Sequence, residues 1–85
     1  MYSIKENLII RKIEHKYVII NMESGEIITF EGTGNIFFET LLESKNELKM
    51  LEYLIEKYEV EEKILKEDIA EFLQSLLEKN IIQRA

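Results

Sequence analysis

The spacing of apolar residues along the chain changes once, near Gly32. Before this glycine, apolar and β-branched residues form short runs separated by turn residues, which is typical of strands. After it, apolar residues recur every three or four positions, which is the spacing of amphipathic helices. Strands of this kind need helices packed against them, so the pattern predicts a single α+β domain over residues 1–85.

The first part of the chain predicts three strands, at residues 7–14, 17–22 and 26–31. Only His15-Lys16 separates the first two, a gap short enough for a tight hairpin. Gly25 precedes the third strand and supplies the positive φ that a turn needs. Adjacent residues such as Ile27-Ile28 put apolar groups on both faces, so one face packs on helices while the other is partly covered or available. The three strands are therefore expected to form an antiparallel meander.

The second part predicts three helices, of which the first covers residues 35–43. Thr33 and Asn35 are the candidate N-caps of this helix. Ser44 and Glu47 match a capping box, in which each side chain bonds to the backbone of the other. The second helix is therefore expected to begin at this box.

The second helix is expected to end near Tyr58, and the third runs from about Glu61 to Asn80. Asparagine tolerates the left-handed conformation in which many helices end. Ile81 and Ile82 then pack back on the core. The stripes that we expect to be buried are Ile36, Phe37 and Leu41 in the first helix, Leu48, Leu51, Ile55 and Tyr58 in the second, and Leu65, Ile69, Phe72, Leu73 and Leu76 in the third.

Charge and composition narrow the possible partners. The chain carries 17 acidic and 11 basic side chains, a net charge of −6, without a basic cluster. Nucleic-acid binding depends on Lys and Arg that neutralise phosphates, so we expect no nucleic-acid partner. The absence of cysteine fits a reducing cytoplasm. There is no secretory signal and no apolar run long enough to span a bilayer, so we expect a cytoplasmic protein with no membrane partner.

The sequence contains no constellation of residues that suits catalysis. His15 is the only histidine, it lies in a predicted turn, and no cysteine accompanies it. Zinc ligands are missing, and the acidic residues of the last helix lack the glycine-bearing loop of a calcium site. Gly32-Thr33-Gly34 lies between a strand and a helix, but Phe37 replaces the third glycine of a dinucleotide loop. We therefore expect a binding protein without metal or cofactor.

The predicted meander offers a place for a partner. A third strand at the sheet edge exposes backbone N–H and C=O groups. If a helix flanks that edge, the two form a groove for an extended peptide, with backbone hydrogen bonds for affinity and pockets for alternate side chains. Two other functions remain open: a winged-helix transcription regulator, which the acidic charge opposes, and a module that binds a subunit of a larger complex through the same edge.

Five short motifs lie in order along the chain. They are ESGEII at residues 23–28, GTGNIF at 32–37, LIEKYEV at 54–60, DIAEFLQSL at 68–76 and NII at 80–82. In this order and spacing the chain, from about residue 8 to residue 82, resembles the PqqD-like family. That family comprises the precursor-peptide recognition elements of ribosomally synthesised and post-translationally modified peptides, lasso peptides among them. Asn80 stands where the family usually has glycine.

The resemblance implies a winged-helix-like α+β fold and non-catalytic binding of a precursor's leader segment. The leader would add as a strand beside the strand at 26–31, in a cleft closed by the third helix. It would be delivered to a modifying enzyme, such as a radical SAM enzyme, a leader peptidase or a cyclase. The peptide-binding residues carried over by position are Ile27, Ile28, Thr29 and Phe30 of the strand and Ile64, Asp68 and Phe72 of the helix, with Lys63 and Lys66 placed to meet acidic leader residues.

Overall fold

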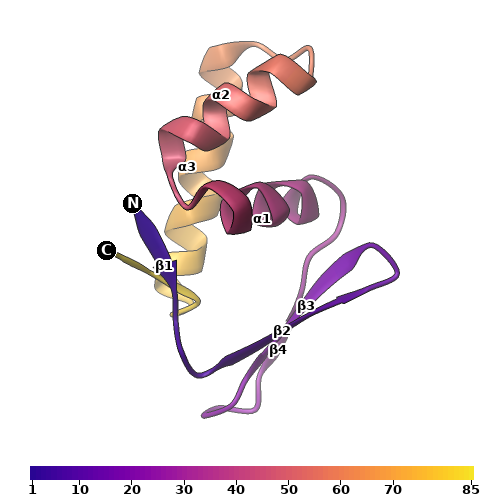
Figure 1. Cartoon of the computed structure of the whole chain (residues 1–85), viewed down its shortest axis with the longest axis vertical. Helices are drawn as coiled ribbons and strands as arrows, with labels where there is room; N and C mark the ends of the chain where they lie inside the picture. Colours follow the sequence, from indigo (N-terminus) through magenta and orange to yellow (C-terminus); the bar gives the residue numbers. More distant parts are fainter.

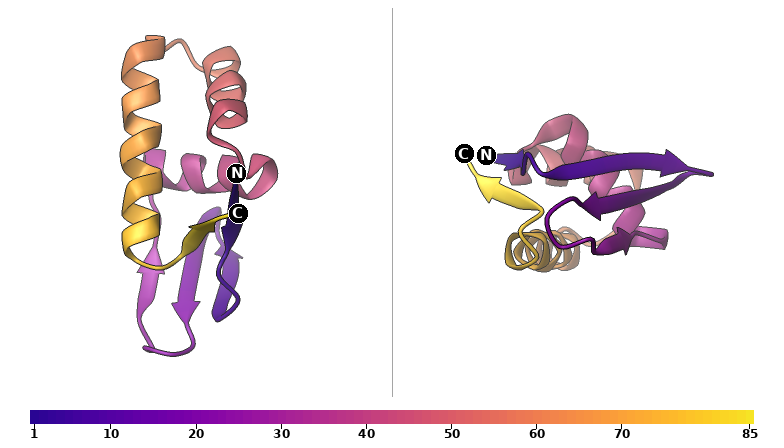
Figure 2. Two further views of the ribbon diagram at one scale, coloured as in Figure 1. Left: turned by 90° about the vertical axis from the view of Figure 1, so that its left-hand side faces the viewer. Right: turned by 90° about the horizontal axis from the view of Figure 1, so that it is seen from below.

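The computed structural model describes all 85 residues and contains five strands and three helices (Figure 1). In chain order they are β1 (Tyr2–Ile4), β2 (Leu8–Ile13), β3 (Lys16–Asn21), β4 (Ile27–Thr29), α1 (Gly32–Ser44), α2 (Glu47–Lys57), α3 (Glu62–Glu78) and β5 (Ile82–Arg84). The sheet of β2, β3 and β4 lies at one end of the molecule, α2 and α3 extend toward the other, and α1 crosses between them (Figures 1 and 2). The predicted α+β fold is confirmed.

The strands β2, β3 and β4 form the predicted antiparallel meander, with β3 in the centre. Ile10, Ile19 and Ile28 lie opposite one another across the three strands, and Ile19 is fully buried. The turn between β2 and β3 consists of Glu14 and His15, with φ of 49° and 72°. Positive φ at both central residues is the mark of a two-residue hairpin loop whose twist matches the strands. His15 is therefore in the turn as predicted, but the turn lies one residue earlier in the chain.

A second, two-stranded sheet joins the ends of the chain, which the hydrophobic pattern did not predict. β1 and β5 pair antiparallel, with Tyr2 opposite Arg84, so the two termini lie side by side (Figure 2). Each strand has three residues, too few for a periodicity to be visible. The expectation that Ile81 and Ile82 pack on the core is confirmed, since each is only 1% exposed.

The helix α1 begins earlier than predicted, at Gly32, and has no side-chain N-cap hydrogen bond. The predicted N-caps Thr33 and Asn35 both lie inside its first turns. Asn35 instead anchors the sheet: its Oδ1 accepts from the Tyr17 N–H at 2.7 Å and its Nδ2 donates to the His15 carbonyl at 2.7 Å. The Tyr17 N–H of β3 would otherwise donate to the backbone that follows β4. Because it donates to the Asn35 side chain instead, the ladder between β3 and β4 ends where α1 begins.

The helix α2 also starts from a different cap than predicted. Ser44 is the last residue of α1 and its hydroxyl donates to the Thr40 carbonyl at 2.8 Å, so it forms no capping box with Glu47. Asn46 is the N-cap, and its side chain accepts from the Lys49 N–H at 3.0 Å. Serine and asparagine cap helices about equally well, so the local sequence does not distinguish between them.

The core lies where the three helices meet the inner face of the meander. Its buried members are Tyr2, Ile19, Phe37, Phe38, Leu41, Met50, Leu51, Leu54, Leu65, Ile69, Leu73, Leu76, Ile81 and Ile82. Three residues predicted to be buried face solvent instead: Ile36, Leu48 and Tyr58. On α1, Phe38 is completely buried, although it was not among the residues predicted to be buried. The end of α3 is as predicted, with Asn80 just beyond it at a φ of 59°.

Replacing Asn35 by alanine is expected to lower the free energy of unfolding by about 1–3 kcal/mol, because the Tyr17 N–H and the His15 carbonyl both lose their partner. Urea denaturation followed by circular dichroism measures this change. Thr33→Ala is the matched control, since Thr33 is exposed in the same turn and makes no side-chain hydrogen bond; its effect should stay within about 0.5 kcal/mol. Equal effects of the two substitutions would contradict the anchoring role.

Candidate functional site

The strand β4 lies at the edge of the meander and has one hydrogen-bonded neighbour, β3. The N–H of Phe30 donates to the Tyr17 carbonyl at 3.1 Å, which shows that the backbone of Phe30 faces β3. Backbone groups alternate in direction along a strand, so those of Ile28 also face β3. Those of Ile27 and Thr29 point the other way, to the side of β4 that no strand covers. This edge is therefore free to pair with another chain.

Aromatic side chains connect the end of β4 to α3. The ring of Phe72, on α3, lies 5.7 Å from that of Phe30 and 5.5 Å from that of Phe37, centroid to centroid. Phe30 also stacks on the buried Phe38 at 4.7 Å. Edge-to-face and offset contacts of this kind add to the stability that burial alone supplies. The aromatic cluster thus connects the end of β4 with α1 and α3.

Two adjoining hollows lie between the first turns of α1 and the outer row of α3. One has a volume of about 300 Å³ and is mostly apolar, with Ile36, Leu54, Tyr58 and Val60 among its lining residues. The other is a shallower depression that extends to Gly34, Glu71 and Phe72. The residues common to both are Thr33, Phe37 and Asp68. We call this continuous surface the α1–α3 groove.

The groove lies directly beyond the end of β4. Gly34 lines it, and a Cβ atom at this position would stand 3.7 Å from the ring of Phe30. Phe72 lines it as well and touches the same ring. An extended chain that pairs with β4 therefore reaches the groove without leaving the surface.

Most of the residues predicted for peptide binding are placed around this edge and groove. On β4, Ile27 is 64% exposed and Thr29 is exposed, whereas Ile28 and the following Phe30 are half-buried against the core. On α3, the half-buried Phe72 and the exposed Asp68 line the groove. Ile64 is 49% exposed and lies one turn before Asp68 on the same row of the helix.

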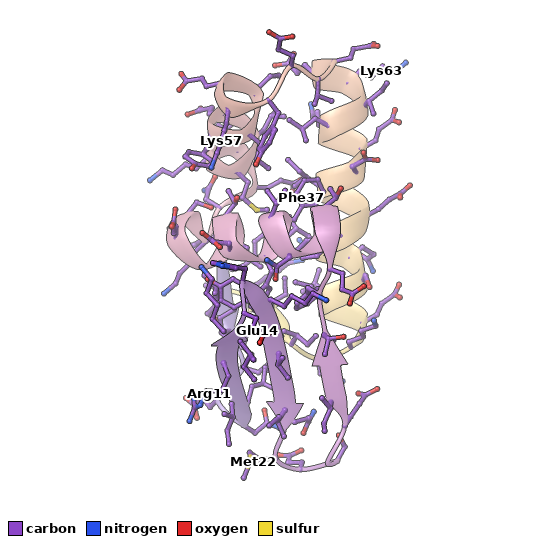
Figure 3. The ribbon with its side chains drawn as sticks, turned by 90° about the vertical axis from the view of Figure 1, so that its right-hand side faces the viewer. Arg11, Glu14, Met22, Phe37, Lys57 and Lys63 are labelled. Carbon is purple, nitrogen blue, oxygen red and sulfur yellow. The ribbon has the colours of Figure 1, made fainter.

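The structure does not bring Lys63 and Lys66 to the groove. Lys66 lines a separate hollow between α2 and α3, together with Leu48 and Leu51. It stands two residues before Asp68, which is about 160° around the helix. Lys63 extends from the far end of α3, away from the sheet (Figure 3). The groove therefore has no lysine on its α3 wall.

Among the groove residues that were not predicted for peptide binding are Thr33, Phe37 and Glu71, which line the part next to Phe72. Glu71 follows Asp68 by three residues, so helical spacing would have identified it. The other two belong to α1. Their position depends on how α1 crosses α3, for which the sequence carries no local signal.

The only charged side chains that line the groove are Asp68 and Glu71. Neither takes part in either of the two salt bridges of the structure. Glu31, the residue just before α1, pairs with Lys16, whose ammonium lies 2.9 Å from its carboxylate. The hydrogen bond and the charge of Lys16 lower the pKa of Glu31. Two unpaired carboxylates thus dominate the charge of the groove.

The rest of the surface shows no constellation for chemistry on a substrate. No group of His, Cys, Asp and Glu side chains is arranged to hold a metal ion. His15 lines a different, polar hollow, with Lys12 and Glu39. None of the helices is long and apolar enough to cross a bilayer. What the edge and the groove can do is bind an extended chain.

Two solved structures have this fold. One is described as "TbiB1 in Complex with the TbiA(beta) Leader Peptide"; it has a TM-score of 0.88 and 18% sequence identity, and the alignment covers 98% of this chain and 96% of that one. The other is described as "Lasso peptide synthetase B1 complexed with the leader peptide", with a TM-score of 0.85, 22% identity and 98% of each chain covered. At such identities the likeness shows the fold alone.

No curated protein sequence matches the chain. The profile of the PqqD family, described as "Coenzyme PQQ synthesis protein D (PqqD)", matches residues 16–82, which is most of the chain. The five motifs that suggested this family all lie within those residues. The chain therefore belongs to the PqqD family.

Proposed function

We propose that this chain binds the leader segment of a ribosomally made precursor peptide and delivers it to a modifying enzyme. In this proposal the leader adds as a strand to the open edge of β4 and continues into the α1–α3 groove. The observation that carries the proposal is the unpaired backbone of Ile27 and Thr29 next to an apolar groove. The chain itself catalyses no reaction and binds no cofactor.

Backbone pairing alone would give weak binding. Four or five hydrogen bonds to β4, at about 1 kcal/mol each, barely offset an association cost of at least about 4 kcal/mol. One or two apolar side chains buried in the groove, worth roughly 1.5–3 kcal/mol each, are therefore needed for the affinity to approach the micromolar range. The hollow of about 300 Å³ lies at the small end of ligand pockets, so it suits a side chain rather than a cofactor.

The two solved structures of the same fold support this function, since both are described as complexes with a leader peptide. Each covers nearly the whole of this chain, including β4, α1 and α3. Because the sequence identities are low, these complexes do not indicate which leader this chain binds. The chemistry of that leader is inferred from the residues that line the groove.

The partner enzyme in this proposal is a radical SAM enzyme, a leader peptidase or a cyclase, lasso peptide biosynthesis included. A bound leader tethers the remainder of the precursor at that enzyme, and effective concentrations of tethered partners reach the millimolar range for short flexible linkers, on the order of 1 mM. The precursor is a ribosomal product, so we place this binding in the cytoplasm.

The function is tested by titration of a fluorescein-labelled leader, taken from a short precursor gene sought among the neighbours of this protein's gene. Fluorescence anisotropy is expected to saturate with a Kd of about 100 μM or lower, equivalent to about 5 kcal/mol or more. A scrambled peptide of the same composition is the control. Absence of saturable binding, or equal binding of the scrambled peptide, would contradict the proposal.

A DNA-binding measurement distinguishes leader binding from the second candidate function, a winged-helix transcription regulator. Affinity for DNA falls steeply with salt, because bound Lys and Arg release counterions from phosphates. The acidic net charge of −6 and the unpaired carboxylates on α3 oppose such binding. Salt-dependent binding to a promoter fragment, in place of leader binding, would favour the regulator.

A further inference from the structure

We propose that the guest of this groove is a cationic extended peptide, with a Lys or Arg side chain placed against Asp68 and Glu71. The inference rests on the proposed function and deepens it by naming the charge of the leader. It differs from the sequence-based expectation of acidic leader residues, which depended on Lys63 and Lys66. Those two lysines lie elsewhere on α3.

The charges of the groove are uncompensated within the chain. Asp68 and Glu71 both line the depression next to Phe72, and no Lys, Arg or His lines either hollow. The salt bridges of the chain, Lys12–Glu39 and Lys16–Glu31, involve other carboxylates. A guest that covers the groove removes water from these two carboxylates, and such desolvation is costly unless an opposite charge accompanies it.

The stability of α3 does not explain these residues. Asp68 and Glu71 are three positions apart, and Glu67 and Glu71 are four apart, so like charges are neighbours on the helix surface. Pairs of this kind destabilise a helix by about 0.2–0.5 kcal/mol each. A local arrangement that opposes folding, without a compensating contact inside the chain, is expected at functional sites. A bound cation relieves the repulsion.

The dipole of α1 opposes the negative charge of the groove. The N-terminus of α1 lies at the groove, and the first turn of this helix contains no acidic residue. A helix N-terminus is equivalent to about half a positive charge. Against it stand two full negative charges on α3, so the groove is negative on balance.

Lysine and arginine also fit the apolar part of the depression. Phe72 lines it beside the two carboxylates, and Phe37 lies next to Phe72. A long aliphatic stem packs on these rings while the charged head reaches the carboxylates. Arginine adds a planar group that bonds a carboxylate through two donors and stacks on an aromatic ring.

The test compares leader binding by the wild-type chain and by the double variant Asp68→Asn, Glu71→Gln, which keeps the shape of both side chains. At low salt the double variant is expected to bind the labelled leader about five- to twenty-fold more weakly. At 0.5 M added salt, on the order of a 4 Å screening length, the difference should nearly vanish. The matched control is Glu52→Gln, Glu56→Gln, two exposed positions of α2 that do not line the groove, which removes the same charge. It is expected to change the Kd by less than about two-fold.

Exchange of the charges completes the experiment. Alanine substitution along the leader identifies the Lys or Arg that contributes most to binding. A leader in which this residue is replaced by Glu should bind the wild-type chain poorly and should bind the variant Asp68→Lys, Glu71→Lys better. If the leader binds and neutralising the two carboxylates leaves the Kd unchanged or improves it, the cationic guest is ruled out while the proposed function stands. A bound leader segment that contains no Lys or Arg would also rule out the cationic guest and leave the proposed function standing. If the leader does not bind the wild-type chain at all, the proposed function fails, and this inference with it.

Discussion

Proline in place of Thr29 is expected to weaken leader binding by at least about tenfold, while the free energy of unfolding changes by less than about 1 kcal/mol. The N–H of Thr29 points away from β3, so its removal costs the fold no ladder hydrogen bond. In the complex, the same N–H would bond to the leader backbone. Its loss leaves a leader carbonyl without a partner, and the proline ring stands where that carbonyl would approach. Anisotropy measures the binding and urea denaturation measures the stability.

The matched controls for this prediction are Thr29→Val and Ile28→Pro. Valine retains the N–H and suits a strand, so leader binding should be unchanged within about two-fold. Proline at Ile28 removes an N–H that faces β3, so it should destabilise the fold by about 3 kcal/mol or more. If Thr29→Pro binds the leader as well as the wild-type chain does, the leader does not pair with β4.

Replacing Phe38 by alanine is expected to lower the free energy of unfolding by about 3–5 kcal/mol, the largest effect on stability that we expect from a single substitution. Phe38 is completely buried, and the centroid of its ring lies 4.7 Å from that of Phe30 and 5.4 Å from that of Tyr17. Small domains have a total stability of about 5 kcal/mol, so a large fraction of the variant should be unfolded at 25 °C. Urea denaturation and the dispersion of amide NMR signals measure this directly.

The control for Phe38 is Ile36→Ala, two residues earlier on the same helix, where the side chain is 37% exposed. It should cost about 1 kcal/mol, because little apolar surface returns to water. A saturating leader is expected to restore folding of the Phe38→Ala variant in part, since a ligand that binds only the folded state stabilises it. Similar stability losses for the two variants would contradict the central position of Phe38 in the core.

The core and the groove share the same aromatic side chains. Phe30 contacts the buried Phe38 on one side and Phe72 at the groove on the other. A substitution at Phe30 or Phe72 therefore changes stability and binding together. The backbone of Thr29 and the carboxylates of Asp68 and Glu71 lie outside the aromatic cluster, so they give cleaner tests of function.

The element types and the meander were predictable from the sequence, because they depend on local spacing. Alternating apolar runs and a Gly25 turn predict strands, and a repeat of three to four residues predicts helices. The helix caps were less predictable. Thr33, Asn35 and Ser44 are all good caps in isolation, yet the structure uses Asn35 to hold the turn at His15 and Ser44 to close the last turn of α1. Long-range contacts decided between locally equivalent choices.

The candidate site, too, was only partly predictable from the sequence. The edge strand was predicted from the pattern of the strands. The residues Ile64, Asp68 and Phe72 were carried over from the family resemblance, and helical spacing adds only that they lie on one row of the helix. Lys63 and Lys66 were assigned to the site as basic residues of the same helix that could meet acidic leader residues. Their direction around the helix depends on which face of α3 is packed against the core.

The sequence by itself therefore determined the order of strands and helices, the family, the absence of an evident catalytic constellation and the strand that offers a free edge. Only the tertiary structure decided that β1 and β5 pair, since strands of three residues carry no periodicity. It also decided that the first turn of α1 meets α3, which creates the groove at Thr33 and Phe37. The charge of that groove depends on which face of α3 is turned toward it. The core contacts of Leu65, Ile69 and Leu73 orient the helix so that Asp68 and Glu71 face the groove and the two lysines do not.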